Sequence, residues 1–298
     1  YGHTEPLLSF LGVDEFIRIL KSDRPMQGIL VCEKLGLLQH IAQDVSRGIG
    51  VEQNQAHAYD VYEHLLRTLQ HAADKKWPFH VRLAALFHDV AKPETRRWSK
   101  EKNNWTFYGH EVVGSRVTRK ALTALKFSRE TVDLVSNLVR WHMFFSDPDT
   151  VTLSAVRRTI QNVGKDYIED LLNLRICDRI GTGRPKEQPF RFRKYKSMVE
   201  EALRDPISVK MLKINGKRIM EVSHETPGPR IGYTLHALLE EVLDDSTKNT
   251  PEYLERRAIE LMNMPENQLA ELGEQGKEKS AEEEENAVHE IQKKHRVA

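Results

Sequence analysis

Hydrophobic residues along this chain recur at spacings of three and four, which is the period of an amphipathic helix. Aromatic and β-branched residues rarely alternate with the period of two that marks strands. The helical pattern is clearest at positions 81, 84, 85 and 88, at 132, 135, 138 and 139, and at 168, 171, 172 and 176. The pattern predicts an all-α fold.

Proline, glycine and capping residues give the expected helix limits. Pro78 precedes one helix and Pro93 is expected to end it, because proline disfavours the helical conformation in the residue before it. A long helix should end near Arg179, ahead of the glycine- and proline-containing segment 181–185. Segment 249–251 (Asn-Thr-Pro) is typical of a helix cap followed by proline at an early helical position.

These signals divide the chain into four parts. Residues 1–50 are expected to form a short helical lead-in, and residues 51–183 a histidine-rich core domain. Residues 184–266 are expected to form a second, smaller helical module. Residues 267–298 are rich in Glu and Lys and are expected to be a solvated helix or a disordered tail.

Composition indicates a soluble cytoplasmic protein. Hydrophobic residues make up 39% of the chain and charged residues 30%, and no apolar run approaches the roughly 18–20 residues of a membrane span. No signal peptide is recognisable at the start. The two cysteines, Cys32 and Cys177, lie in apolar surroundings, which favours buried thiols over a disulfide or metal ligands. With 45 basic and 44 acidic residues, the net charge of +1 does not by itself indicate a nucleic-acid partner.

An adjacent His-Asp pair is the clearest chemical signal. His88 and Asp89 follow an apolar helical run, and Lys92 comes three residues later. Adjacent residues on a helix point about 100° apart, so a metal held by both needs further ligands from other helices. The chain offers suitable side chains in four further segments: His64, His110, His142 and Asp178.

Imidazole and carboxylate ligands together suit Mn, Fe, Co, Ni or Zn, with Mg less favoured. Such a cation lowers the pKa of its bound water to roughly 7. A second cation held by His110 and His142, with Asp89 as a bridge, would clamp a phosphate. Lys92 and Arg140 would then neutralise phosphoryl oxygens, so that Asp89, Lys92 and Arg140 are the predicted catalytic residues.

Each of these residues also has a simpler interpretation. A single histidine on an apolar face is more often a core residue than a ligand, and His57 or His71 could replace His64 in the set. His64 is preferred because a helix through this segment turns it inward. The chain has no Gly-x-Ser-x-Gly, P-loop or Gly-x-Gly-x-x-Gly motif, and position 114, where a zincin motif needs histidine, is glycine.

The order His64, His88-Asp89, His110, His142, Asp178 resembles the HD superfamily of metal-dependent phosphohydrolases. The flanking sequence is similar, over roughly residues 12–265, to bacterial CCA-adding tRNA nucleotidyltransferases and poly(A) polymerases, from the neck through the HD domain to the body and tail. The similar segments are 17–25, 35–38, 50–64, 107–111, 139–143, 212–216, 227–232 and 238–243. The resemblance implies an HD helical bundle followed by a smaller helical body and tail. It also implies a role in tRNA 3′-end processing.

The nucleotidyltransferase head of that family, with its Gly-Ser element and paired carboxylates, is not found in these residues. The resemblance therefore assigns to this chain the chemistry of the HD domain, which is phosphodiesterase or phosphatase action on 2′,3′-cyclic or 2′-phosphates. All six ligand positions hold the expected residue types, which favours an active site.

A basic and aromatic segment follows the core domain. Phe190, Phe192 and Tyr195 alternate there with cations that could contact RNA phosphates, namely Arg184, Lys186, Arg191, Arg193, Lys194 and Lys196. An ordinary helix start with buried rings and solvated charges is the alternative. The expected partners are a tRNA or other RNA 3′ end and nucleotide phosphate esters.

Three functions remain open at this point. The first is an HD phosphohydrolase within a tRNA nucleotidyltransferase family protein. The second is a non-catalytic tRNA-binding scaffold with a structural HD site. The third is a free-standing HD nucleotidase.

Overall fold

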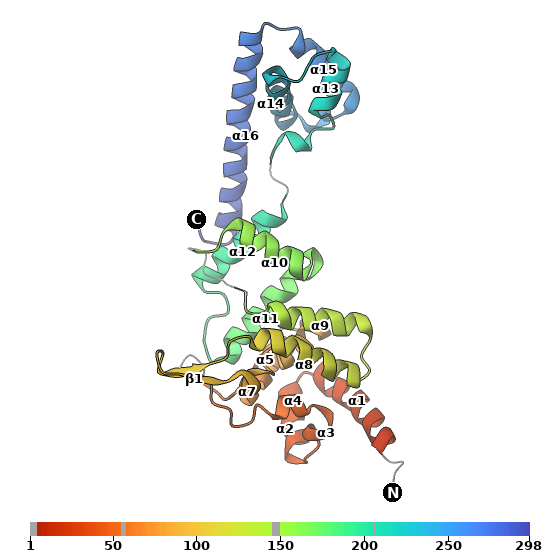
Figure 1. The fold of residues 1–298 in the computed structure, drawn as a ribbon, viewed down its shortest axis with the longest axis vertical. Coiled ribbons are helices and arrows are strands. Elements are labelled where there is room, and N and C mark those ends of the chain that lie inside the picture. Colours follow the sequence, from red (N-terminus) through yellow and green to blue (C-terminus); the bar gives the residue numbers. More distant parts are fainter. Residues whose placement is uncertain (1–4, 55–57, 145–149, 205–206) are drawn as a thin grey trace. The chain divides into compact units, whose positions relative to one another are not determined.

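The computed structural model describes residues 5–54, 58–144, 150–204 and 207–298, and in these ranges nearly all of the regular secondary structure is helical (Figure 1). This confirms the all-α prediction. The chain divides into two compact units, residues 1–199 and 200–298. No helix in the described part of the chain is both long enough and apolar enough to span a bilayer. Both cysteines are buried and carry free thiols, as predicted.

The first unit contains the predicted ligand residues. Its elements are α1 Glu5–Lys21, α2 Pro25–Lys34, α3 Leu38–Ile41, α4 Gln43–Ser46, α5 Val61–Asp74, α6 Phe79–Phe87, α7 Lys92–Thr95, β1 Arg97–Ser99, β2 Asn104–Thr106, α8 His110–Ala124, α9 Arg129–Trp141, α10 Leu153–Val163, η1 Lys165–Tyr167, α11 Ile168–Gly181 and the first part of α12 Phe190–Leu203.

Helices α5, α6, α9 and α11 form the core of this unit, packed against one another through the faces that the sequence pattern predicts. On α9 the buried residues include Val132, Val135, Leu138 and Val139. On α11 the buried face continues from its apolar residues to Asp178. The apolar packing of these helices thus fixes the positions of the polar residues that share their faces.

The limits of α6 differ from the prediction. The helix ends at Phe87 with His88 as its C-cap, well before Pro93. Pro93 instead lies in the first turn of the short helix α7, where the missing proline N–H breaks no helical hydrogen bond. His88 and Asp89 therefore lie at the end of α6, in the turn that leads to α7.

A two-stranded antiparallel hairpin, β1–β2, was not predicted. Its strands are three residues long and pair Trp98 with Trp105, and Asn103 in the connecting turn has a positive φ of 44°. Strands this short show too few alternating positions for the period of two to be recognised.

The second unit contains the end of α12, η2 Val209–Met211, α13 Gly216–Ser223, α14 Pro229–Asp244, η3 Ser246–Lys248, α15 Pro251–Met262 and α16 Glu266–Lys294. Thr250 caps α15 by accepting a hydrogen bond from the amide of Tyr253, as the sequence suggests. The charged segment 267–298 is mostly one helix, α16, and not a disordered tail. It packs along α14, where a Cβ on Gly276 would lie 2.2 Å from the carbonyl oxygen of His236.

A glycine also allows α11 to approach α5 in the first unit. A Cβ on Gly181 would lie 2.0 Å from Thr68 Oγ1 and 3.1 Å from both His64 Nδ1 and the His64 carbonyl oxygen. Thr68 cannot turn away without losing its 2.7 Å hydrogen bond to that carbonyl. The distance between His64 and Asp178 therefore depends on the glycine.

Replacing Gly181 with alanine is expected to destabilise the first unit, because the added methyl group pushes α11 away from α5. Overpacking of this kind costs about 1–3 kcal/mol, so the thermal unfolding midpoint should fall by at least about 2 °C. Differential scanning calorimetry measures the change.

The matched control is Gly114→Ala on α8, where the added Cβ would make only ordinary contacts, the nearest at 3.5 Å to Val139. This variant should keep or raise the midpoint, because alanine favours helix by up to about 1 kcal/mol over glycine. Equal thermal unfolding midpoints for the Gly181→Ala and Gly114→Ala variants would show that the stability of the unit does not depend on the close approach of α11 to α5 at Gly181.

Candidate metal centre

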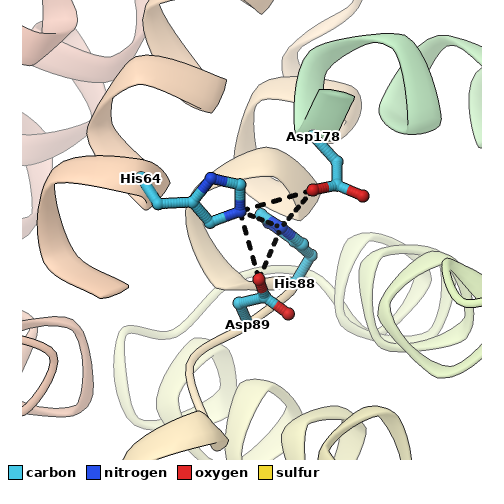
Figure 2. A group of neighbouring side chains, drawn as sticks. All are labelled: His64, His88, Asp89 and Asp178. Carbon is cyan, nitrogen blue, oxygen red and sulfur yellow. Dashed lines mark hydrogen bonds and ion pairs between the residues drawn. The ribbon is translucent and has the colours of Figure 1, made fainter. Parts of the chain in front are cut away.

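Three helical segments bring the first group of four predicted ligands together. His64 comes from α5, His88 and Asp89 from the end of α6, and Asp178 from α11, and all four side chains are buried. Figure 2 shows that the two rings and the two carboxylates point toward one another. His64 Nε2 lies 3.0 Å from His88 Nε2, 3.1 Å from Asp89 Oδ2 and 3.4 Å from Asp178 Oδ1.

The other carboxylate oxygen of Asp89 faces a second group. Asp89 Oδ1 lies 3.1 Å from Nε2 of His110, the first residue of α8, and 3.5 Å from Nε2 of His142, the C-cap of α9. The two rings are themselves in contact, with their Nε2 atoms 3.3 Å apart. Asp89 is therefore common to both groups, in the bridging arrangement that the sequence predicts.

Three of the four imidazoles are oriented by backbone carbonyl groups. The Nδ1 atoms of His88, His110 and His142 each lie within hydrogen-bond distance of the carbonyl oxygen three residues earlier, at 2.9 Å from Ala85, 2.6 Å from Phe107 and 2.7 Å from Val139. A ring that donates its proton from Nδ1 keeps a lone pair on Nε2. These lone pairs point at carboxylate oxygens, an arrangement that is repulsive unless a proton or a cation lies between them.

The pKa shifts of the cluster show that its carboxylates favour a positive charge beside them. Burial opposes ionisation of His88, but the carboxylates of Asp89 and Asp178 raise its pKa to about 9. Despite the cost of burial, His88 and Lys92 hold the pKa of Asp89 well below its usual range. Burial lowers the pKa of His142 to about 4, which keeps that ring neutral. The cluster therefore stabilises positive charge between its carboxylates.

The donor atoms fit divalent cations. The ligand atoms of His64, His88, Asp89 and Asp178 lie within 4.8 Å of one another, as do those of Asp89, His110 and His142. Two ligand atoms about 2.1 Å from a shared metal ion are about 3.0–3.4 Å apart at angles of 90–109°. The separations from His64 Nε2 fall in that range.

Lys92 lies next to the shared carboxylate. Its Nζ is 2.5 Å from Asp89 Oδ2 and donates a hydrogen bond of 2.6 Å to Gln53 Oε1. Gln53 is anchored in turn, because its side-chain amide donates to the carbonyl oxygens of Tyr59 and Asp60, at 3.2 Å each. Lys92, which the sequence predicts to contact phosphoryl oxygens, thus forms an ion pair with Asp89.

The structure places Arg140 elsewhere. Its guanidinium group lies 4.7 Å from the centre of the Trp141 ring, and it lines a separate pocket of about 260 Å³. Arg175, which sequence reasoning missed, lies at the cluster and pairs with Asp178 Oδ2 through its Nη1. The contact with Arg175 leaves Asp178 Oδ1 facing the histidines.

A cleft of about 1140 Å³ opens onto the cluster, and Asp89, Lys92, His110 and Asp178 line it. Of the six cations predicted to contact RNA, Arg184 and Arg191 line the cleft. Lys196 forms a 3.0 Å ion pair with Glu169, and Arg193 donates to the carbonyl oxygen of Gln188. Two of the six predicted RNA contacts, Arg184 and Arg191, therefore line the cleft, whereas Lys196 and Arg193 bond to other parts of the protein.

One of the two alternative histidines, His71, lies within the described residues, and it is not part of either ligand group. His71 lies about two turns further along α5, with its Nε2 3.5 Å from Glu187. His57 lies outside the residues that the structure describes.

Comparison with known proteins agrees with this geometry. Residues 61–181 match the family model of the HD domain, and this range contains all six ligand positions. The chain is 34% identical over 232 residues to a CC-adding tRNA nucleotidyltransferase of Thermus thermophilus, a match that covers 76% of this chain and 51% of that protein. It is 31% identical over 232 residues to an A-adding tRNA nucleotidyltransferase of Deinococcus radiodurans, covering 76% of this chain and 52% of that protein.

A more distant relative is the multifunctional CCA protein of Neisseria meningitidis, 25% identical over 195 residues, which are 63% of this chain and 46% of that protein. The chain thus spans about half the length of the curated relatives it matches. It carries an HD domain at residues 61–181 and is similar, over 76% of its length, to tRNA nucleotidyltransferases.

Proposed function

We propose that the chain acts as a metal-dependent phosphohydrolase on 2′,3′-cyclic or terminal phosphates of nucleotides, within a protein that processes tRNA 3′ ends. The observation that carries the proposal is the buried Asp89 carboxylate, whose two oxygens each face a pair of imidazole Nε2 atoms. Three of these four rings have Nδ1 at a backbone carbonyl oxygen, which turns their Nε2 atoms toward Asp89. A metal centre needs this arrangement.

His64, His88, Asp89 and Asp178 would hold one divalent cation, and Asp89, His110 and His142 would hold a second. Bound there, such cations would supply Lewis acidity that polarises a phosphoryl oxygen and makes water a stronger nucleophile near neutral pH. In hydrolysis of a cyclic phosphate, the water oxygen bonds to phosphorus and one ribose P–O bond breaks. The proton lost by the water ends on the released ribose oxygen.

The chain's own cations have separate roles in this proposal. Lys92, held by Gln53, offsets the charge of Asp89 and faces the cleft, where it would contact a phosphoryl oxygen. Arg175 fixes Asp178 and also lines the cleft. Both act in a buried site, where a charge interacts more strongly than it does in water.

The proposed substrate class rests on the surroundings of the site and on the relatives. The cleft carries aromatic and basic residues, which suit the base and the phosphate of a nucleotide. The printed names of the relatives concern tRNA, and we extend tRNA to this chain as its proposed partner.

Hydrolysis of 2′,3′-cyclic AMP by the chain loaded with Mn, Co, Ni, Zn or Mg tests the proposal. We expect turnover that is abolished by a chelator and restored by the metal. Asp89→Asn should lower kcat/KM by roughly 100-fold or more, because even the loss of an outer partner of a metal ligand typically costs 10–100-fold. Product formation measured by chromatography gives the rates.

The matched control is Asp166→Asn, which makes the same change at an exposed position of η1. Metal content and thermal unfolding of both variants show whether they fold. Absence of turnover with all five metals in a folded, metal-loaded chain would contradict the hydrolase proposal and leave a non-catalytic RNA-binding role.

Arg140 and Arg175 provide a second test. The sequence predicts Arg140 as a catalytic residue, whereas in the structure Arg175 pairs with the candidate ligand Asp178. Arg175→Ala should lower kcat/KM by about 10–100-fold, since it releases the ligand Asp178. Arg140→Ala should cause a smaller loss, because Arg140 lies outside the residues that line the cleft. Steady-state kinetics on the same cyclic nucleotide measures both variants, and a larger loss for Arg140→Ala would show that this side chain moves to the substrate.

A further inference from the structure

The exposed aromatic side chains of the described residues gather around one cleft. They are Trp98, Tyr108 and Phe190. Tyr108, with 74% of its surface exposed, and Phe190 line the cleft above the metal centre. Trp98 packs edge-on against Trp105, which also lines it, at 5.1 Å between ring centres. Aromatic rings that are exposed to solvent beside a candidate active site indicate a surface that binds a ligand by stacking.

These rings form two walls from different parts of the chain. The first wall is strand β2 and the segment that follows it, residues 104–109, and the second is residues 189–192 at the start of α12. The ligands Asp89, His110 and Asp178 also line the cleft, so the candidate metal centre opens into it. A ligand that enters the cleft can therefore contact both walls and the metal centre.

Basic side chains hold the first wall in place. The guanidinium group of Arg96 lies 3.7 Å from the centre of the Trp105 ring, and Lys102 Nζ donates a 2.6 Å hydrogen bond to the Tyr108 hydroxyl. Both rings thus have a defined orientation before a ligand binds. Fixed rings lose little conformational entropy on stacking.

The charge of the lining suits a polyanion. Apart from the ligands Asp89 and Asp178, Glu111 is the acidic residue among the described lining residues. The basic lining residues are Lys92, Lys102, Arg175, Arg179, Arg184 and Arg191. Lys92 and Arg175 pair with Asp89 and Asp178, and the other four cations still exceed what the phosphate of one mononucleotide needs. The volume of about 1140 Å³ also exceeds the roughly 300–1,000 Å³ of a small-molecule site.

We infer that the cleft is a clamp for the 3′ end of a single-stranded RNA, with the rings of Tyr108 and Phe190 stacking on its bases and the rim arginines contacting its phosphates. The inference rests on the proposed phosphohydrolase function, which places a 2′,3′-cyclic or terminal phosphate at the metal centre. A cyclic phosphate of this kind lies at the 3′ end of a strand. The preceding nucleotides must therefore leave the metal centre between the two walls.

Binding of a five-nucleotide RNA with a 5′ fluorescein and a 3′ hydroxyl, measured by anisotropy in the presence of a chelator, tests the clamp without any turnover. We expect the affinity to fall as salt rises, because phosphate contacts release counterions. Tyr108→Ala should raise Kd about tenfold, the effect of one lost stacking contact, whereas Tyr108→Phe keeps the ring and should stay within about threefold of the parent. Arg184→Ala should weaken binding and reduce the salt dependence.

The control variants are Leu35→Ala and Arg158→Ala, which remove an exposed apolar and an exposed basic side chain that do not line the cleft. Both should bind RNA as the parent does. Absence of binding, or equal Kd values for Tyr108→Ala and Leu35→Ala, overturns the clamp. RNA binding without hydrolysis supports the clamp and contradicts only the hydrolase, whereas hydrolysis of 2′,3′-cyclic AMP without RNA binding contradicts only the clamp.

Discussion

The position of the Asp89 carboxylate constrains the packing of the first unit, residues 1–199. Asp89 is buried, and each of its oxygens contacts imidazoles from different helices. A buried carboxylate without partners is costly, so the helices that carry those partners must pack closely around the end of α6. The packing of α5 and α11 is part of the same constraint, since Gly181 allows His64 and Asp178 to meet. Fold and site are therefore held by the same contacts.

The site uses helix ends for a physical reason. The last four carbonyl groups of a helix have no partner within the helix. Ala85 and Val139 supply such carbonyls in the last turns of α6 and α9, and they accept from Nδ1 of His88 and His142. The hydrogen bonds that satisfy these helix ends thus also select the tautomer and aim Nε2 at Asp89. Placing a histidine directly after a helix combines termination of the helix with orientation of a ligand.

The sequence predicts the six candidate ligands better than it predicts the charged residues and the hairpin around them. The six ligand residues could be named because their types and their apolar surroundings suit a metal, and the structure brings all six together. Arg140 lies two residues before His142, about 200° around the helix, and lines a second pocket beside Trp141. Arg175 lies three residues before Asp178 and therefore on the same face, a signal that helical spacing already offers. The hairpin could not be predicted, since three-residue strands carry almost no pattern.

The candidate metal ligands and the residues that surround the cleft come from different parts of the chain. Helices supply the ligands, whereas the hairpin lies in the connection between Asp89 and His110, and the second wall begins after the helix that carries Asp178. A connection can change in sequence without disturbing the helical core, because few core contacts depend on it. Substrate choice can therefore vary through residues 97–109 and 184–192 while the metal ligands stay fixed. The exposed rings Trp98, Tyr108 and Phe190 and the cleft arginines Arg184 and Arg191 lie in those two segments, which is where a preference for an RNA strand over a single nucleotide would be encoded.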